Sequence, residues 1–187
     1  MSNLEYGPLA SIIGVWEGDN GTDVAPEPND GIEHNPYSEI LTCEPAGDVS
    51  NASKQKLWAV RYHQTARRIS DNTVFHDQVG YWMWDAEQKQ VIQSLTIPRA
   101  VCVLAGGISS TDANGTLHLD VSATDGDAHW GIIQSPFMNN NAKTSAYRYQ
   151  LSVEDDVLTY SQSILLEIYG KFFDHTDSNT LLRSYRP

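Results

Sequence analysis

The sequence predicts an all-β protein: a single antiparallel, up-and-down β-barrel of about ten strands around an internal ligand cavity. Two observations support this. Segments in which apolar and polar residues alternate, rich in β-branched and aromatic side chains, recur along the chain, and short turn sequences separate them. About ten antiparallel strands in one sheet leave two open edges, and closure into a barrel removes them while leaving room for a small ligand. A β-sandwich is the structural alternative.

The first part of the chain contains one helix candidate and two long polar connections. The stretch from Pro8 to Ile13 is the only expected helix, and the first strand begins at Gly14. The segment Asp19 to Pro36, DNGTDVAPEPNDGIEHNP, is polar and contains Pro and Gly, so a loop or flap is expected there. The segment PAGDVSNASKQ predicts the tip of a long hairpin.

The middle strands follow a period of two. In KLWAVRYHQTA, one face has Trp58, Val60 and Tyr62, and the other has Leu57, Ala59, Arg61 and His63. Alternation favours the first set as the apolar, inward face, but the inner face of a ligand-binding barrel can be the more polar one, so both assignments stay open. In QVGYWMWD the two faces are Val79, Tyr81 and Met83 against Gly80, Trp82 and Trp84. The sequence DAEQKQ predicts the turn that follows.

The later strands alternate in the same way. TLHLDVSA places Leu117, Leu119 and Val121 on one face, and AYRYQLSVE does so with Tyr147, Tyr149, Leu151 and Val153. VLTYSQSILLEIYG has Leu158, Tyr160, Gln162, Ile164, Leu166 and Ile168 on one face. The sequences TDANGT and VEDDV predict turns.

The final stretch, IYGKFFDHTDSNTLLRSYRP, departs from apolar–polar alternation. Gly170 is expected to break the preceding strand, because glycine weakens strands. KFFDHTDSN is then expected to cross the barrel opening, with Phe172 or Phe173 buried as an anchor, before TLLRSYR re-enters the sheet. This order puts His175 at or just before the start of the last strand, with its ring directed into the cavity.

Composition limits the function classes. The 187 residues suit one domain, residues 1–187, and the net charge of −12 disfavours nucleic acid and anionic membrane surfaces as partners. No apolar run reaches membrane-spanning length, and the N-terminus lacks the features of a secretory signal. Cys43 and Cys102 are expected to be buried strand cysteines of a reducing compartment, so a cytoplasmic location is expected.

Several segments together resemble a known family. The Gly-x-Trp sequence at Gly14 to Trp16 is similar to the signature of lipocalin-type barrels, in which an arginine of the last strand stacks on the tryptophan; Arg183 is the first candidate for this and Arg186 the second. LASIIGVWEG, PYSEILTC, DQVGYWMWDAEQKQVIQSLTIPRAVCVLAGG, LTYSQSILLEIYG and FDHTDSNTLLR occur in one order and spacing. Through these segments the chain resembles the nitrobindin-like haem-binding β-barrels, as a divergent member. Those barrels are related in shape to fatty-acid-binding proteins and other calycin barrels.

The resemblance implies a cofactor and its ligand. Nitrobindin-like barrels bind ferric haem, here haem b, through one histidine near the C-terminus, and YGKFFDHTDSNTLLR selects His175 as the axial iron ligand. Asp174 and Asp177 are both close enough in sequence to accept its second ring N–H. The resemblance also implies conversion of peroxynitrite to nitrate at the iron and is compatible with a homodimer. A surface histidine in a polar turn is the alternative for His175.

Other pocket residues are candidates on weaker grounds. Arg61 and His63 could meet a carboxylate or a haem propionate if their strand face is interior, with Tyr62 as a further polar anchor. Trp130 and Phe137, in HWGIIQSPFMNN, could bend over the pocket mouth or pack under a loop. No motif of a hydrolase, a P-loop or a dinucleotide site is present, and no catalytic side chain is predicted. The second functional hypothesis is a non-catalytic carrier of a fatty acid or another small hydrophobic or amphipathic ligand.

Overall fold

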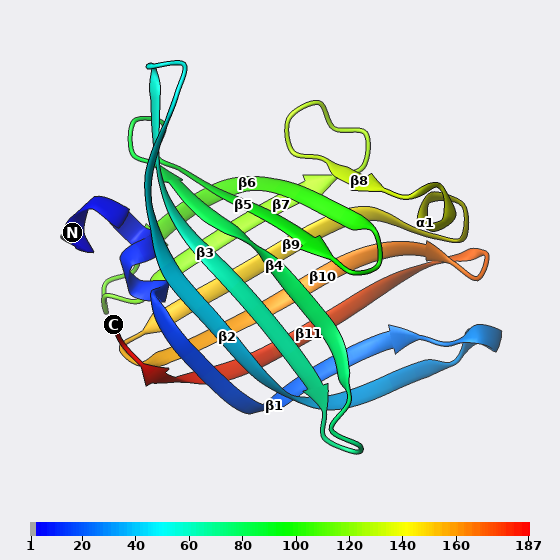
Figure 1. Ribbon diagram of the computed structural model, residues 1–187. Coiled ribbons are helices and arrows are strands. Elements are labelled where there is room, and N and C mark those ends of the chain that lie inside the picture. The colour runs from blue at the N-terminus through cyan, green and yellow to red at the C-terminus, as the bar shows by residue number, and fades with distance from the viewer. Residues whose placement is uncertain (1–2) are drawn as a thin grey trace.

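The computed structural model describes residues 3–187, with side chains from Glu5 onward, and is a closed β-barrel (Figure 1). Its strands are ordered β5-β4-β3-β2-β1-β11-β10-β9-β7-β6, all neighbours antiparallel, and pairing of β5 with β6 closes the barrel. The ten strands of the barrel are β1 (Gly14–Pro26), β2 (Ile32–Asn51), β3 (Gln55–Arg68), β4 (Val74–Asp85), β5 (Gln90–Ile97), β6 (Val101–Thr111), β7 (Leu117–Thr124), β9 (Ala142–Glu154), β10 (Val157–Ile168) and β11 (Lys171–Tyr185). The all-β barrel predicted from the sequence is confirmed.

Three short elements complete the fold. The N-terminal 3₁₀ segment Asn3–Ile12 is interrupted at Gly7, and a second 3₁₀ turn, Pro28–Asp30, forms the tip of the β1–β2 hairpin. The short strand β8 (Ile132–Gln134) pairs with the start of β6 beyond the end of β7, and the helix α1 (Pro136–Asn141) follows it. Among residues 3–187, no helix has both the length and the apolar character needed to cross a bilayer.

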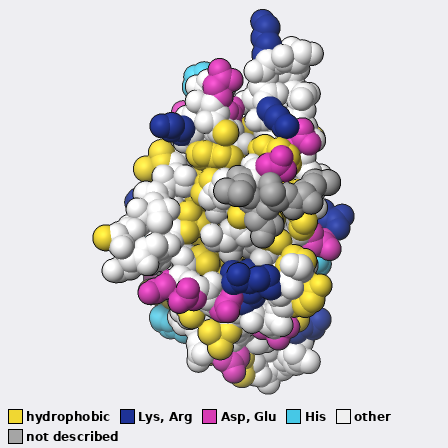
Figure 2. All heavy atoms as spheres, turned by 90° about the vertical axis from the view of Figure 1, so that its left-hand side faces the viewer, with side chains coloured by type: hydrophobic (Ala, Val, Ile, Leu, Met, Phe, Trp, Pro, Cys, Tyr) yellow, Lys and Arg dark blue, Asp and Glu magenta, His cyan; other side chains and the backbone are white. Residues whose placement is uncertain are grey.

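One end of the barrel is closed by Trp16 and Arg183. The Trp16 side chain is fully buried, its indole N–H donates to the carbonyl of Ile12 at 2.8 Å, and the Arg183 guanidinium lies 3.8 Å from the ring centroid. Arg183 also donates to the carbonyl oxygens of Ser11 and Ile13 and pairs with Asp156. The predicted stacking of Arg183 on Trp16 is therefore confirmed, and Arg183 fastens the 3₁₀ segment to the last strand. Figure 2 looks at this end, where acidic and basic side chains lie beside hydrophobic ones.

A bulge in β1 reverses which residues of the strand face inward. Trp16 points into the barrel near the closed end, whereas Gly21 and Asp23 are the buried positions further along. The register shifts between Gly18 and Gly21 against β2 and between Glu17 and Thr22 against β11, which inserts one extra residue in β1. A Cβ on Gly21 would lie 2.3 Å from the Tyr37 ring, so only glycine leaves space for that ring. The bulge thus turns Asp23 toward the interior of the open end.

The structure corrects the expectations for two segments of the chain. The segment Asp19 to Pro36 is not a flap: it forms the second part of β1 and the start of β2, joined by the tip at Pro28–Asp30. The final stretch does not cross the opening, because Ile168 pairs directly with Lys171 and a tight turn joins β10 to β11. Both turn residues, Tyr169 and Gly170, have positive φ, as a two-residue hairpin turn requires.

His175 is therefore the fifth residue of β11 rather than a residue before it. Phe172 is exposed and Phe173 half-buried, so neither is the fully buried anchor that was expected. Of the two free cysteines, Cys43 is buried as expected but Cys102 is exposed on the outer face of β6. The other turn and hairpin predictions agree with the strand boundaries, including the long β2–β3 ribbon that projects from the barrel (Figure 1).

The closed end provides a stability prediction. Replacing Arg183 by Ala removes the stacking on Trp16 and leaves two backbone carbonyls and Asp156 without this donor, so the free energy of unfolding should fall by about 2–4 kcal/mol. Arg186→Ala is the matched control, because Arg186 pairs with the same Asp156 but is exposed, and it should cost under about 0.5 kcal/mol. Urea unfolding followed by tryptophan fluorescence measures both. Equal losses in the two variants would contradict a structural role for the stacked arginine.

Candidate functional site

The open end of the barrel, opposite the Trp16 end, holds a cavity of about 300 Å³. Its wall has two sides of different character. The strands β1 to β4 and β11 supply polar and charged side chains, including Asp23, Asn35, Arg68, His76 and His175. The rest is largely apolar and comes from β10, α1, the end of β5 and the start of β6, with Ile97, Val101, Met138, Ile164, Leu166 and Ile168. Such a cavity suits a ligand with one apolar and one polar part.

A continuous hydrogen-bond chain connects four strands at this wall. The His175 Nε2 lies 2.6 Å from Asp23 Oδ1, and the Asn35 amide donates to Asp23 Oδ2 at 2.9 Å. The Arg68 Nε donates in turn to Asn35 Oδ1 at 3.2 Å. Because β11, β1, β2 and β3 each contribute one residue, the chain fixes the side chains across adjacent strands rather than within one.

Asp23 and His175 form a hydrogen-bonded pair in which each shifts the pKa of the other. Burial by itself would raise the pKa of Asp23, but the hydrogen bonds from His175 and Asn35 and the nearby positive charge outweigh it, and the pKa lies below its usual value. Burial likewise works to lower the pKa of His175, but the hydrogen bond and negative charge of Asp23 raise it overall. An ionised Asp23 can only accept, so the His175 Nε2 carries the hydrogen. The other ring nitrogen, Nδ1, is then the one left for a ligand when the imidazole is neutral.

A second carboxyl group, Asp177, lies two residues further along the inner face of β11. Burial raises the pKa of Asp177 to about 7, against the lowering effects of the His175 charge and of the Gln162 amide, which donates at 2.8 Å. Asp177 therefore holds its proton for part of the time at neutral pH. His76, on the same wall, is the opposite case, because burial lowers the pKa of its imidazole and keeps it neutral.

A layer of buried hydrogen bonds forms the floor of the cavity. The Glu39 carboxylate accepts from Tyr160, Gln64 and Asn179 at 2.7, 2.8 and 3.0 Å, and the Tyr37 and Tyr160 hydroxyls are 2.7 Å apart. Burial raises the pKa of Glu39 against the effect of these three donors. Below this layer, toward the closed end, the interior is dominated by apolar and aromatic side chains.

The residues proposed from sequence lie in different places. His175 is on the cavity wall, as described above. Arg61 and His63 face outward, paired with Glu44 and Asp77, so the interior face of β3 is the apolar one. Tyr62 is buried below the cavity, where it accepts from the amides of Gln78 and Gln93.

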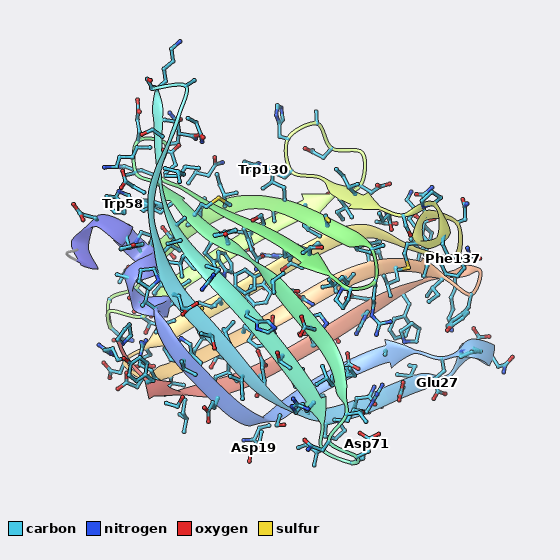
Figure 3. All side chains as sticks on the ribbon, in the orientation of Figure 1. Asp19, Glu27, Trp58, Asp71, Trp130 and Phe137 are labelled. Atoms are coloured by element: carbon cyan, nitrogen blue, oxygen red, sulfur yellow. The ribbon has the colours of Figure 1, made fainter. Side chains whose placement is uncertain are left out.

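The two aromatic candidates lie away from the cavity wall. Figure 3 labels Phe137 on α1 at the open end and Trp130 in the loop before β8. Phe137 is 71 % exposed, and its neighbour Met138 is the α1 residue that lines the cavity. Trp130 is half-buried against Gly106 on the outside of the barrel, where a Cβ on that glycine would lie 2.2 Å from the indole. Neither Trp130 nor Phe137 lines the cavity.

Several residues of the site were not found from the sequence. His76 and Gln78 follow the inward parity of Trp82 along β4, a signal that was present but not extended to the start of the strand. Asp23 could not be placed by parity, because the bulge reverses it. Arg68 lies at the end of β3 and Arg99 in the β5–β6 connection, where the period of two carries little information. Among the described residues, no cluster of three or more His, Cys, Asp or Glu is arranged to hold a metal ion.

Comparison with known families assigns the barrel. A family model described as "THAP4-like, heme-binding beta-barrel domain" matches residues 5–183. The chain belongs to this family. The crystal structure of Rv2717c from M. tuberculosis is similar to this THAP4-like barrel, with a TM-score of 0.70, 20 % sequence identity and 98 % of each chain covered. At this identity the likeness shows the fold. No curated protein matched the chain.

Membership in the THAP4-like heme-binding family confirms the nitrobindin-like resemblance found in the sequence. Family membership also supports a barrel that binds a small ligand, which agrees with the cavity at the open end.

The raised pKa of Asp177 predicts a pH-dependent stability. Because the folded chain holds this proton up to about pH 7 while an unfolded Asp releases it near 3.8, its contribution to stability falls as pH rises between these values. Asp177→Asn removes this loss. The effect of the substitution on the free energy of unfolding should therefore be more favourable at pH 8 than at pH 4, by about 1–4 kcal/mol. The comparison is made with the parent chain by urea unfolding at both pH values. Asp174→Asn, at an exposed position of the same strand, is the control. If Asp177→Asn changes the free energy of unfolding by the same amount at both pH values, Asp177 is not protonated in the folded chain.

Proposed function

We propose that this barrel binds haem b at its open end and that His175 is the axial ligand of the iron. The proposal rests on one observation within a family described as heme-binding: an imidazole on the cavity wall whose Nε2–H is held by a carboxylate of a neighbouring strand. Metal-bound histidines commonly donate their second ring N–H to a carboxylate, which fixes the ring and the tautomer. Asp23, rather than Asp174 or Asp177, has this position.

The residues present fit the group. The cavity offers two imidazoles, His76 and His175, of which only His175 is hydrogen-bonded to a carboxylate of the described residues. It also offers an apolar side of Ile, Leu, Val and Met residues that can face a macrocycle, and polar groups near the rim. Its volume of about 300 Å³ is at the small end of ligand pockets, which run from about 300 to 1,000 Å³. A macrocycle would therefore be only partly enclosed, with its more polar edge toward the opening.

Each residue has a defined part in this function. Asp23 orients His175, and Asn35 orients Asp23 through its second oxygen. Ile164, Leu166 and Val101 exclude water from the apolar side of the cavity. Asp177 and His76 keep one exchangeable proton and one neutral imidazole beside the site near pH 7. Haem, when bound, would supply the iron chemistry that isomerises peroxynitrite to nitrate, as the family resemblance suggests.

A non-catalytic carrier of a small amphipathic ligand is the second candidate. The division of the cavity wall into an apolar and a polar side favours it, together with the modest volume. The two candidates differ in a simple observable, because a carrier purified with an aliphatic ligand lacks haem absorbance. Native mass spectrometry before and after delipidation identifies such a ligand by its mass.

The haem proposal predicts a spectrum and a specific loss. Purified protein titrated with hemin should develop a Soret band with saturable, one-to-one binding. His175→Ala should shift or remove this band, because the axial nitrogen is lost.

His63→Ala is the matched control, since His63 also contacts a carboxylate, at 3.1 Å from Asp77, but on the outer face of the barrel. It should leave the spectrum unchanged. A Soret band that is identical in His175→Ala and the parent protein would exclude His175 as the ligand.

A further inference from the structure

The rim of the cavity contains two arginines that have no carboxylate partner. Arg68 at the end of β3 and Arg99 in the β5–β6 connection both line the cavity. Of the twelve Lys and Arg side chains, seven lie within 4.0 Å of a carboxylate of the described residues. Arg68 and Arg99 are among the other five, in a chain with twice as many acidic as basic residues. Two guanidinium groups without a carboxylate of the described residues within 4.0 Å therefore lie at one opening.

Phe75 brings the two guanidinium groups to the same sector of the rim. The Arg68 guanidinium carbon lies 5.0 Å from the centre of the Phe75 ring, and Arg99 donates to the Phe75 carbonyl at 3.4 Å. The other bond of Arg68, to Asn35, uses its Nε. These contacts hold the two side chains while leaving most of their terminal N–H groups available, which is the donor arrangement that suits a carboxylate.

Neither arginine has a carboxylate of the described residues within 4.0 Å, although Asp71, in the β3–β4 turn, is close enough to Arg68 for the two charges to interact. The cavity lining contains three carboxyl groups, Asp23, Glu33 and Asp177. Asp23 is bonded to His175, and Asp177 lies on β11 with its carboxyl bonded to Gln162. Glu33 is the third carboxyl group of the cavity lining. Arg99 lies close enough to His76 and His175 for its charge to act on both imidazoles, so it faces the cavity and not only the solvent.

We propose that Arg68 and Arg99 form an anion-binding rim that receives the carboxylate of an amphipathic ligand while its apolar part fills the cavity. This inference rests on the proposed function, because it specifies the ligand of the same cavity. The apolar side formed by Ile164, Leu166 and Met138 then meets the apolar part of the ligand. The propionates of haem and the head group of an aliphatic acid share this chemistry, and the experiment distinguishes them.

The test compares ligands that differ only in their carboxylates. Hemin is compared with hemin dimethyl ester, and dodecanoate with dodecanol, each titrated by absorbance or by tryptophan fluorescence. The parent protein should prefer the acid over its neutral analogue. Arg68→Gln and Arg99→Gln should each weaken binding of the acid by about tenfold and leave the neutral analogue unaffected, as expected for loss of a charge-assisted hydrogen bond.

One control variant, and one of the variants already named, guard against effects on folding or on surface charge. Arg67→Gln is the matched control, because Arg67 also lacks a carboxylate partner but faces outward on the same strand, and it should change nothing. Arg99→Gln alone suffices if Arg68→Gln is destabilised by loss of its Asn35 and Phe75 contacts, since Arg99 is exposed and lies outside the strands.

The outcomes separate this inference from the haem proposal. A preference for hemin over its ester that the arginine variants abolish, with an unchanged Soret position, supports both. If hemin does not bind, and the protein prefers dodecanoate over dodecanol in a way that the arginine variants abolish, the result supports the rim and overturns haem binding. Hemin binding with no preference over the ester, or with a preference that survives both substitutions, overturns the rim and leaves haem binding intact. Failure of both acids to bind overturns the rim.

Discussion

The arrangement of the site depends on one extra residue in β1. A regular strand would present alternate residues to the interior along its whole length, so Trp16 and Asp23, which are seven positions apart, could not both face inward. The bulge between Gly18 and Gly21 makes this possible. Trp16 can then stack under Arg183 at the closed end while Asp23 reaches His175 at the open end. Gly21 also leaves the space that the Tyr37 ring occupies, and Tyr37 belongs to the floor of the cavity.

The charges at the open end are compatible with folding because they are mutually compensated. An isolated carboxylate buried in an apolar barrel would be strongly unfavourable, but Asp23 has the His175 imidazole and the Asn35 amide as hydrogen-bond partners. Burial raises the pKa of Asp177, and the Gln162 amide, its one hydrogen-bond donor among the described residues, does not offset this. The site therefore retains one carboxyl group, Asp177, whose ionisation burial disfavours, next to another, Asp23, whose ionisation its partners favour. A ligand that reached His175 would change both equilibria.

Sequence reasoning was accurate where the interior is apolar and failed where it is polar. The alternation in β7, β9 and β10 correctly identified inward positions such as Leu119 and Leu158, and in β3 it favoured Val60 without excluding the other face, because burial and hydrophobicity coincide there. In β11 the inward residues His175, Asp177 and Asn179 are polar, so the regular alternation of burial was mistaken for a loop. The same cause produced the error at Asp19 to Pro36. Polar inner residues and a bulge leave no hydrophobic signal, and only pairing with neighbouring strands places them.

These two failures coincide with the functional end of the barrel. The closed half is an ordinary apolar core, and there local sequence pattern and tertiary structure agree. The open half departs from that agreement on β1, β2 and β11, which contribute Asp23, Asn35 and His175. Polar residues on inward positions of several adjacent strands reduce the apolar area that folding can bury, so they are not explained by stability. The Glu39 layer separates the two halves and sets the depth that a ligand can reach. A ligand held above this floor must present its remaining length to the rim, where Arg68 and Arg99 lie.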